Sequence, residues 1–220
     1  MKYKYILFDL DGTLTDPKVG ITKSVKYALN KNNIEVESLD DLIKFIGPPL
    51  KESFMEFYSF DKERANKAIE YYREYFKDKG IFENEVYEGM PELLRDLKSN
   101  GFIIAIATSK PTVFAERIVE HFALKEYFNI VVGSNLDGSR TNKGEVISYV
   151  LEQLNINNLE EVVMIGDRKH DIIGAHKNNI DSIGVLYGYG DLEEFQEVAP
   201  KHVVGSVSDL YKLIINHHKI

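Results

Sequence analysis

The sequence contains no cysteine and no tryptophan. Without cysteine the chain has no disulfide bond, no thiolate metal site and no cysteine nucleophile. A chain without disulfides is typical of the cytoplasm, and we expect the protein there. No apolar run approaches about 18 residues, so we expect no membrane-spanning helix and no membrane partner. The apolar run near the start of the chain is also too short for a signal peptide.

Basic residues are fewer than acidic ones. The 27 Lys and Arg residues against 35 Asp and Glu give a net charge of −8. Such a chain has no global attraction for nucleic acid, although a local basic pocket can still bind an anionic substrate. Its 220 residues, 44% of them hydrophobic, can build a sizeable core. They suit one domain with a large insertion or two small domains, and a monomer is compatible with this size.

Five short apolar runs are expected to form strands. They are continuous rather than alternating, which is typical of parallel strands buried on both faces. Helical patterns lie between them, and this alternation predicts an α/β fold with a doubly wound parallel sheet. The expected strands are 5–8, 102–107, 130–132, 162–165 and 183–186, and the clearest helices between them are 91–99, 111–122 and 143–154.

Residues 17–85 break this alternation because they contain no convincing strand. Helical patterns cover 21–31, 39–45, 50–58 and 62–77 instead. We therefore expect an α-helical cap domain over 17–85, inserted into a core domain formed by 1–16 and 86–220. The expected hinges are 15–18 and 80–89.

Four carboxylates follow the ends of two expected strands. Asp9 and Asp11 are two residues apart after the first strand, so they point the same way, and Gly12 permits a sharp turn. Asp167 and Asp171 follow the fourth strand. The carboxyl ends of parallel strands share one edge, where these groups would repel each other unless a cation joined them. Oxygen ligands favour Mg²⁺, and we expect it near Asp9, Asp11, Asp167 and Asp171.

Hydroxyl groups and a lysine mark two other junctions. Thr108 and Ser109 precede a helix, where hydroxyls and free amides can bind phosphate. Lys143 lies near the start of a helix, where its charge is unfavourable against the helix dipole and a bound phosphate would offset that cost. Each feature alone also fits a helix cap, a turn or a surface lysine. Their order at successive junctions favours a phosphate-handling site.

Together these features resemble the haloacid dehalogenase superfamily of phosphatases over essentially the whole chain. The insertion after the first strand resembles the helical C1-type cap of that superfamily. The matching motifs are Asp9-Leu10-Asp11-Gly12-Thr13, then Thr108, then Lys143, then Gly166-Asp167 with Asp171. Residues 46–50, 166–171 and 184–190 resemble phosphoglycolate phosphatases and their 5'-nucleotidase-like relatives.

The resemblance implies a covalent mechanism. Asp9 attacks phosphorus and forms an aspartyl phosphate, while Asp11 protonates the leaving oxygen and later takes a proton from water. It implies that Mg²⁺ is held by Asp9, the carbonyl of Asp11 and Asp167. The substrate is then a small phosphorylated metabolite. Phosphoglycolate is the first expectation, with nucleoside 5'-monophosphates and sugar phosphates as alternatives.

The resemblance also assigns the binding residues. Thr108, Ser109, Lys143 and backbone amides near Gly12 hold the phosphoryl oxygens. Asp171 orients Lys143 or contacts the metal or its water. The cap closes over the site and selects the substrate.

One cap residue is a separate hypothesis. Lys51 follows Gly47 and two prolines, which turn and stiffen the segment before it. We expect it to bind a second anionic group of the substrate, such as a carboxylate. An ordinary surface lysine is the alternative.

Related activities share most of these residues. A phosphomutase needs cap groups that hold a sugar bisphosphate in two orientations, and the only arginines in 17–85 are Arg64 and Arg73. A phosphonate-cleaving relative needs a cap lysine for a Schiff base, and the expected cap contains many lysines. A non-enzymatic phospho-acceptor, like a signalling receiver domain, is a single domain of roughly 120 residues without a cap. Such a module does not use an acid–base group like Asp11.

Overall fold

The computed structural model describes residues 3–216. The chain divides into two compact units: one ends at Thr15 and resumes at Val86, and the other is Asp16–Glu85. The sequence placed these boundaries after residues 16 and 85. None of the helices within 3–216 is long and apolar enough to cross a membrane.

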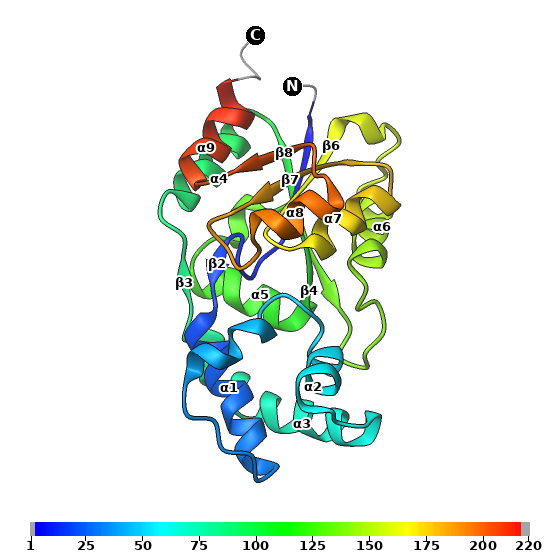
Figure 1. Ribbon diagram of the computed structural model, residues 1–220. Helices are drawn as coiled ribbons and strands as arrows, with labels where there is room; N and C mark the ends of the chain where they lie inside the picture. The colour runs from blue at the N-terminus through cyan, green and yellow to red at the C-terminus, as the bar shows by residue number, and fades with distance from the viewer. Residues whose placement is uncertain (1–2, 217–220) are drawn as a thin grey trace. The chain divides into compact units, whose positions relative to one another are not determined.

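The first unit has an α/β fold, in which helices cover both faces of a β-sheet (Figure 1). Its strands are β1 Tyr5–Phe8, β4 Ile103–Pro111, β5 Ile130–Ser134, β6 Val162–Gly166, β7 Asp181–Val185 and β8 His202–Val204. Its α-helices are α4 Met90–Ser99, α5 Thr112–His121, α6 Lys143–Gln153, α7 Lys169–Lys177, α8 Leu192–Val198 and α9 Val207–Tyr211. Shorter turns are η3 Lys125–Tyr127, η4 Leu159–Glu161 and the π-helical η5 Lys212–Asn216.

Six strands form a parallel sheet in the order β5-β4-β1-β6-β7-β8, which confirms the expected fold class. In β1, Leu7 pairs with Ala105 of β4 and Met164 of β6. The chain adds β4 and β5 on one side of β1 and then returns to its other side for β6. The carboxyl end of β1 is therefore the topological switch point, where open α/β sheets bind ligands.

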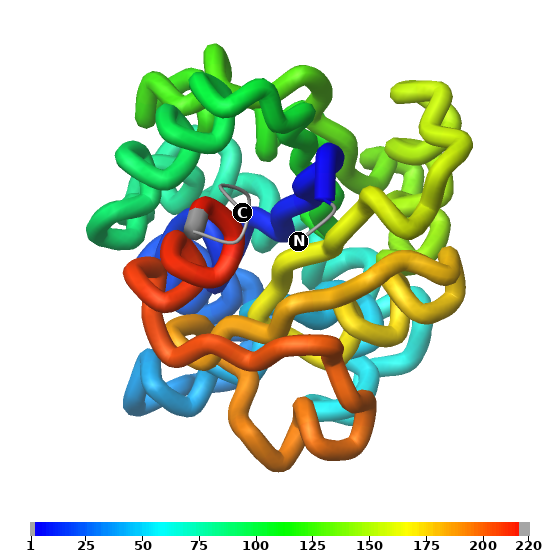
Figure 2. The backbone as a smooth tube through the Cα atoms, turned by 90° about the horizontal axis from the view of Figure 1, so that it is seen from above, coloured from blue at the N-terminus to red at the C-terminus, as the bar shows by residue number. Residues whose placement is uncertain are grey.

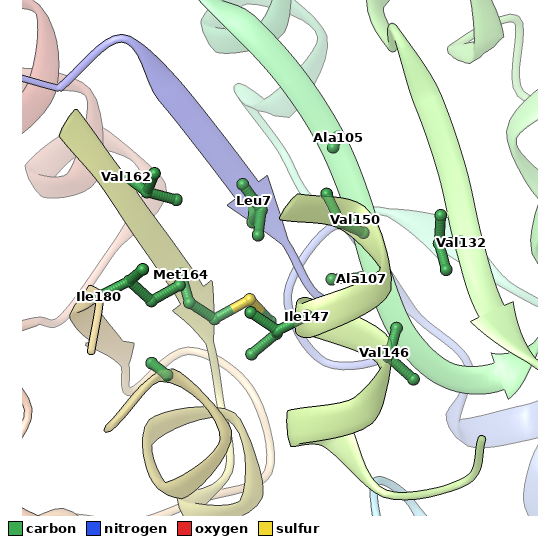
Figure 3. Packing of buried hydrophobic residues seen from close by; sticks show 11 residues of the cluster. Leu7, Ala105, Ala107, Val132, Val146, Ile147, Val150, Val162, Met164 and Ile180 are labelled. Atoms are coloured by element: carbon green, nitrogen blue, oxygen red, sulfur yellow. The ribbon is translucent and has the colours of Figure 1, made fainter. Parts of the chain in front are cut away.

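The core explains why the strand sequences are continuously apolar. Ile6, Leu7 and Phe8 of β1 are all fully buried, because helices cover both faces of the sheet. α6 and α7 pack on one face, and α4, α5 and α9 pack on the other (Figure 2). Figure 3 shows the α6 face, where the buried cluster includes Leu7, Ala105, Val132, Val146, Ile147, Val150 and Met164.

The second unit is helical. It contains α1 Lys18–Lys31, η1 Leu39–Phe45, α2 Leu50–Tyr58, α3 Lys62–Phe76 and η2 Gly80–Phe82. α1 packs against α3 and η1. Phe54 belongs to an aromatic cluster, with its ring 5.0 Å from that of Phe45 and 5.8 Å from that of Phe60. This cluster gives the unit an apolar core of its own.

The structure differs from the expected elements at several points. The sequence predicted none of β8, α7, α8 and α9, which are all short. The expected helix at 39–45 is a 3₁₀ helix. Two short strands, β2 Thr15–Asp16 and β3 Glu85–Val86, were also not expected and form a separate two-stranded sheet.

Candidate active site

Asp9 and Asp11 lie where β1 ends. The Asp9 amide still donates to the carbonyl of Ile165 in β6, at 2.9 Å. Beyond it the chain folds into a tight loop, in which the Gly12 amide donates to the carbonyl of Thr15 at 2.7 Å. Both aspartates are buried, Asp9 at 5% and Asp11 at 8% exposure. The loop thus keeps two carboxylates out of water at the switch point of the sheet.

Two features of the structure require a glycine at position 12. Its φ of +81° is favourable only for glycine, and a Cβ there would lie 2.1 Å from Oδ2 of Asp167. The same Asp167 oxygen accepts a hydrogen bond from the Tyr189 amide at 2.8 Å, while Thr13 Oγ1 donates to the other oxygen at 3.4 Å. Gly12 therefore permits the first and fourth motifs to touch. Its expected phosphate-binding role stays a prediction.

Asp9, Asp167 and Asp171 form a buried acidic cluster. Each offers one oxygen, and these oxygens lie within 4.8 Å of one another. Burial, with the nearby Asp171 and Asp9 carboxylates, raises the pKa of Asp167 well above its ordinary value. Buried carboxylates this close repel one another unless a cation joins them, and a site that offers only oxygen ligands fits a bound Mg²⁺. The Asp11 side chain is not part of this cluster.

Lys143, at the start of α6, connects two of these carboxylates. Its Nζ lies 2.8 Å from Asp9 Oδ1 and 2.8 Å from Asp171 Oδ1, and it donates to the carbonyl of Ala107 at 2.9 Å. Burial alone lowers the pKa of Lys143, but Asp171 and Asp9 outweigh it and the net pKa is raised. These carboxylates offset the unfavourable charge at the helix start. The expected phosphate contact of Lys143 stays a prediction.

Asp171 is held by the first turn of α7. Its Oδ2 accepts a hydrogen bond from the Arg168 amide at 3.1 Å, as part of a capping box. The N-cap of α7 is Arg168 and not Asp167. Burial raises the pKa of Asp171 to about 6, although the Lys143 ammonium opposes the shift.

Thr108 and Ser109 lie in an irregular end of β4. The pairing register with β5 shifts between Ala107 and Pro111, so the segment bulges. Thr108 Oγ1 is buried and accepts a hydrogen bond from the Lys110 amide at 3.3 Å. The expected strand ended at Ala107 and missed this extension. The phosphate roles of Thr108 and Ser109 stay predictions.

Lys110 was missed by the sequence analysis. Its Nζ lies 2.7 Å from Asp11 Oδ2, and both side chains are largely buried. Burial raises the pKa of Asp11, and the Lys110 charge opposes that shift. The signal in the sequence was a cation two residues after Thr108, but regular strand spacing does not predict its direction, because the backbone bulges between Ala107 and Pro111.

The loop after β7 packs against the loops that carry the first and fourth motifs. Tyr187 Oη donates to the carbonyl of Thr13 at 3.0 Å. A Cβ at Gly188 would lie 2.2 Å from the carbonyl oxygen of Gly12, and one at Gly190 would lie 1.9 Å from that of Asp167. These two glycines allow the loop to approach both carboxylate motifs. The sequence marked 184–190 as a family-like stretch but did not predict these contacts.

Lys51 belongs to the helical unit. It lies in the first turn of α2, partly exposed, after Gly47 with its φ of +101°. It is not among the residues that the α/β unit brings together, and its role as a substrate contact stays a prediction.

Comparison with known proteins decides the family. Residues 6–185 match the family model described as haloacid dehalogenase-like hydrolase. The chain belongs to the haloacid dehalogenase-like hydrolase family. A predicted phosphatase of Clostridium acetobutylicum has a crystal structure that is 57% identical, with a TM-score of 0.94, and the match covers 97% of this chain and 99% of that one.

Relatives in the haloacid dehalogenase-like family carry different names. A 5'-nucleotidase of Pseudomonas aeruginosa is 45% identical over 99% of this chain and 98% of its own length. The tyrosine-protein kinase PtkA of Mycobacterium tuberculosis is 39% identical over 84% of this chain but only 62% of its own length. A phosphoglycolate phosphatase of Colwellia psychrerythraea is 28% identical over 93% of this chain and 94% of its own length. This member of the family is a phosphatase.

Proposed function

We propose that this phosphatase hydrolyses a small phosphomonoester through an aspartyl phosphate on Asp9, with Mg²⁺ as its cofactor. The observation that carries the proposal is the buried cluster of Asp9, Asp167 and Asp171 at the end of β1, with Lys143 paired to two of its members. Burying three carboxylates together is costly unless cations compensate them. Lys143 supplies one such charge, and the chemistry of the donor set suits Mg²⁺ as another.

The proposed mechanism has two steps. A carboxylate oxygen of Asp9 attacks phosphorus, and the bond from phosphorus to the leaving oxygen breaks as Asp11 gives that oxygen a proton. Water then attacks the phosphorus of the aspartyl phosphate, Asp11 takes a proton from the water, and Asp9 is released with inorganic phosphate. Asp9, Asp167 and the carbonyl of Asp11 would hold Mg²⁺, which would supply positive charge that offsets the repulsion between the nucleophile and the phosphate.

The remaining residues bind and orient. Thr108 and Ser109 contribute hydroxyls, and the loop around Gly12 contributes backbone amides, for the phosphoryl oxygens. Lys143 has three protein acceptors within 2.9 Å. Its three N–H groups match these three acceptors, so to bind the incoming phosphate it would exchange one of these contacts for a phosphoryl oxygen. Asp171, fixed by the start of α7, keeps the ammonium in that position.

Nucleoside 5'-monophosphates are the substrates with most support. The relative named 5'-nucleotidase is 45% identical over nearly the whole of both chains, whereas the phosphoglycolate phosphatase is 28% identical. This reverses the order expected from sequence, in which phosphoglycolate came first. We also propose a cytoplasmic location, as the cysteine-free sequence favours.

A phosphate-release assay tests the proposal. Nucleoside 5'-monophosphates, phosphoglycolate and sugar phosphates are compared with and without Mg²⁺, and acid-quenched protein is searched by mass spectrometry for a phosphorylated Asp9 peptide. We expect the highest kcat/KM on a nucleotide, no release without Mg²⁺, and the adduct on Asp9. A higher kcat/KM on phosphoglycolate would restore the original order of substrates. A phosphoryl group on any other residue would overturn the mechanism.

A further inference from the structure

The two oxygens of the Asp11 carboxylate have different surroundings. Oδ2 lies 2.7 Å from the ammonium of Lys110. Oδ1 is buried and has no hydrogen-bond partner within residues 3–216. The other buried lysine of this part of the chain, Lys143, contacts Asp9 and Asp171. The two aspartates of the first motif thus each contact a different buried lysine.

The backbone determines the position of Lys110. The bulge at the end of β4 places the Lys110 carbonyl against β5, so that a Cβ at Gly133 would lie 2.0 Å from that oxygen. Ser134 Oγ donates to the carbonyl of Ser109 at 2.8 Å and holds the same bulge. Bulges re-aim a side chain next to an active site. The fixed backbone of the bulge therefore positions Lys110 next to Asp11, unlike a lysine on a flexible surface.

We propose that Lys110 is a positioning residue that fixes which oxygen of Asp11 performs the acid–base chemistry, an inference that rests on the proposed function. An oxygen that already accepts a hydrogen bond from an ammonium does not carry the carboxyl proton. The proton therefore sits on Oδ1. It moves from Oδ1 to the leaving oxygen as the phosphorus–oxygen bond breaks, and Oδ1 takes a proton from water in the second step. Lys110 keeps its own protons throughout.

Two other roles for Lys110 predict different kinetics. A lysine that binds phosphate directly would affect all phosphomonoesters equally and act independently of Asp11. A lysine needed only for folding would lower stability and reduce the active fraction equally for every substrate. A lysine that orients a general acid matters most when the leaving group is a poor one, because a good leaving group departs without a proton.

The experiment compares two aryl phosphates of similar shape, phenyl phosphate and p-nitrophenyl phosphate, so it does not depend on the natural substrate. The variants are Lys110→Met, Lys110→Gln and Lys110→Arg, with thermal melting and calorimetric Mg²⁺ binding as readouts besides activity. For Lys110→Met we expect kcat/KM to fall about 10²-fold on phenyl phosphate, with a clearly smaller loss on p-nitrophenyl phosphate. Lys110→Arg should keep most of the wild-type kcat/KM on phenyl phosphate, because it retains the positive charge. Equal losses on both substrates would overturn the inference. Lys110→Gln provides the same comparison if the methionine variant does not fold.

A double-mutant cycle tests whether Lys110 acts through Asp11. Added to Asp11→Asn, the Lys110→Met change should cost little more, because the group it positions is already lost. Multiplying losses would overturn the inference. If Asp11→Asn is impaired and Lys110→Met is not, this inference alone fails. If Asp11→Asn keeps full activity, the proposed function fails, and the inference fails with it.

Discussion

The two units of the chain bury different kinds of polar group. The α/β unit buries charged side chains, namely Asp9, Asp11, Asp167, Asp171, Lys110 and Lys143. The helical unit, Asp16–Glu85, buries only three polar side chains, Thr22, Ser24 and Ser53, and all of them are hydroxyls. Burying charge is far more costly than burying a hydroxyl. Chains keep buried charges mainly where function requires them.

The partners of these groups differ in the same way. In the helical unit each hydroxyl bonds back to its own helix: Thr22 to the Lys18 carbonyl at 2.6 Å, and Ser24 to the Gly20 carbonyl at 2.6 Å. Such bonds are a local property of helices. In the α/β unit, Lys143 reaches Asp9, which is far away in the sequence. A buried hydroxyl that bonds to its own helix indicates a structural role. Buried charges that pair with residues distant in the sequence indicate an assembled functional site.

The largest effect is expected where a buried charge is the nucleophile. Asp9→Asn should abolish phosphate release, because a neutral amide of similar shape does not attack phosphorus. Melting temperature should change far less than activity. Ser24→Ala is the matched control in the helical unit, and it should leave kcat/KM unchanged. Near-normal turnover by Asp9→Asn would mean that the buried charges of the α/β unit are no more important for activity than the buried hydroxyls of the helical unit.

Removal of Mg²⁺ should abolish activity equally, but reversibly. The metal-free protein should also lose stability as pH rises. The folded-state pKa values of Asp167 and Asp171 are raised above the ordinary 3.8, so the folded state binds more protons than the unfolded state. Its stability is therefore highest below about pH 4 for these groups and falls as pH rises through about 6, the value for Asp171.

The measurement is thermal melting with chelator and with Mg²⁺ at pH 5 and pH 8. Because Mg²⁺ binds the ionised carboxylates, its stabilising effect should be larger at pH 8. An equal shift in melting temperature at both pH values would mean that these carboxylates do not bind the metal.

Much of this arrangement could be predicted from sequence. The apolar runs predicted five of the six strands of the main sheet, because strands covered on both faces are uniformly apolar. β8 escaped because His202–Val204 is three residues long and lies at the sheet edge. The convergence of Asp9 with Asp167 followed from the rule that parallel strands share an edge.

The sequence could not predict contacts that depend on irregular backbone. Lys110 reaches Asp11 through a bulge, and no periodicity in 103–111 encodes that bulge. The closeness of Gly188 to Gly12 and of Gly190 to Asp167 is a tertiary contact that the local sequence pattern does not encode. The pair of Lys143 with Asp171 was expected from the family resemblance, but its contact with Asp9 was not, since a helix-dipole argument does not include carboxylates from distant strands.

A smaller, partial loss is expected for the acid–base group. Asp11→Asn should lower kcat by about 10²–10⁴-fold, the usual range for general acid–base catalysis. Its side chain lies outside the acidic cluster, so calorimetry should show Mg²⁺ binding retained. Loss of metal binding in this variant would assign its carboxylate to the metal instead of its carbonyl.

The smallest effect is expected in the helical unit, and it sharpens the substrate assignment. Lys51 was predicted to bind a second anionic group, which phosphoglycolate has as a carboxylate and an aryl phosphate lacks. An exposed ion pair contributes about 0.2–1 kcal/mol, so Lys51→Ala should raise KM for phosphoglycolate roughly up to fivefold. KM for p-nitrophenyl phosphate and kcat on both substrates should stay unchanged, because Lys51 is predicted to bind only the second anionic group of the substrate and to take no part in the chemistry. Lys62→Ala, an exposed lysine at the start of α3, is the control. Equal losses on both substrates would assign Lys51 to catalysis or folding, and no loss on either would make it an ordinary surface lysine.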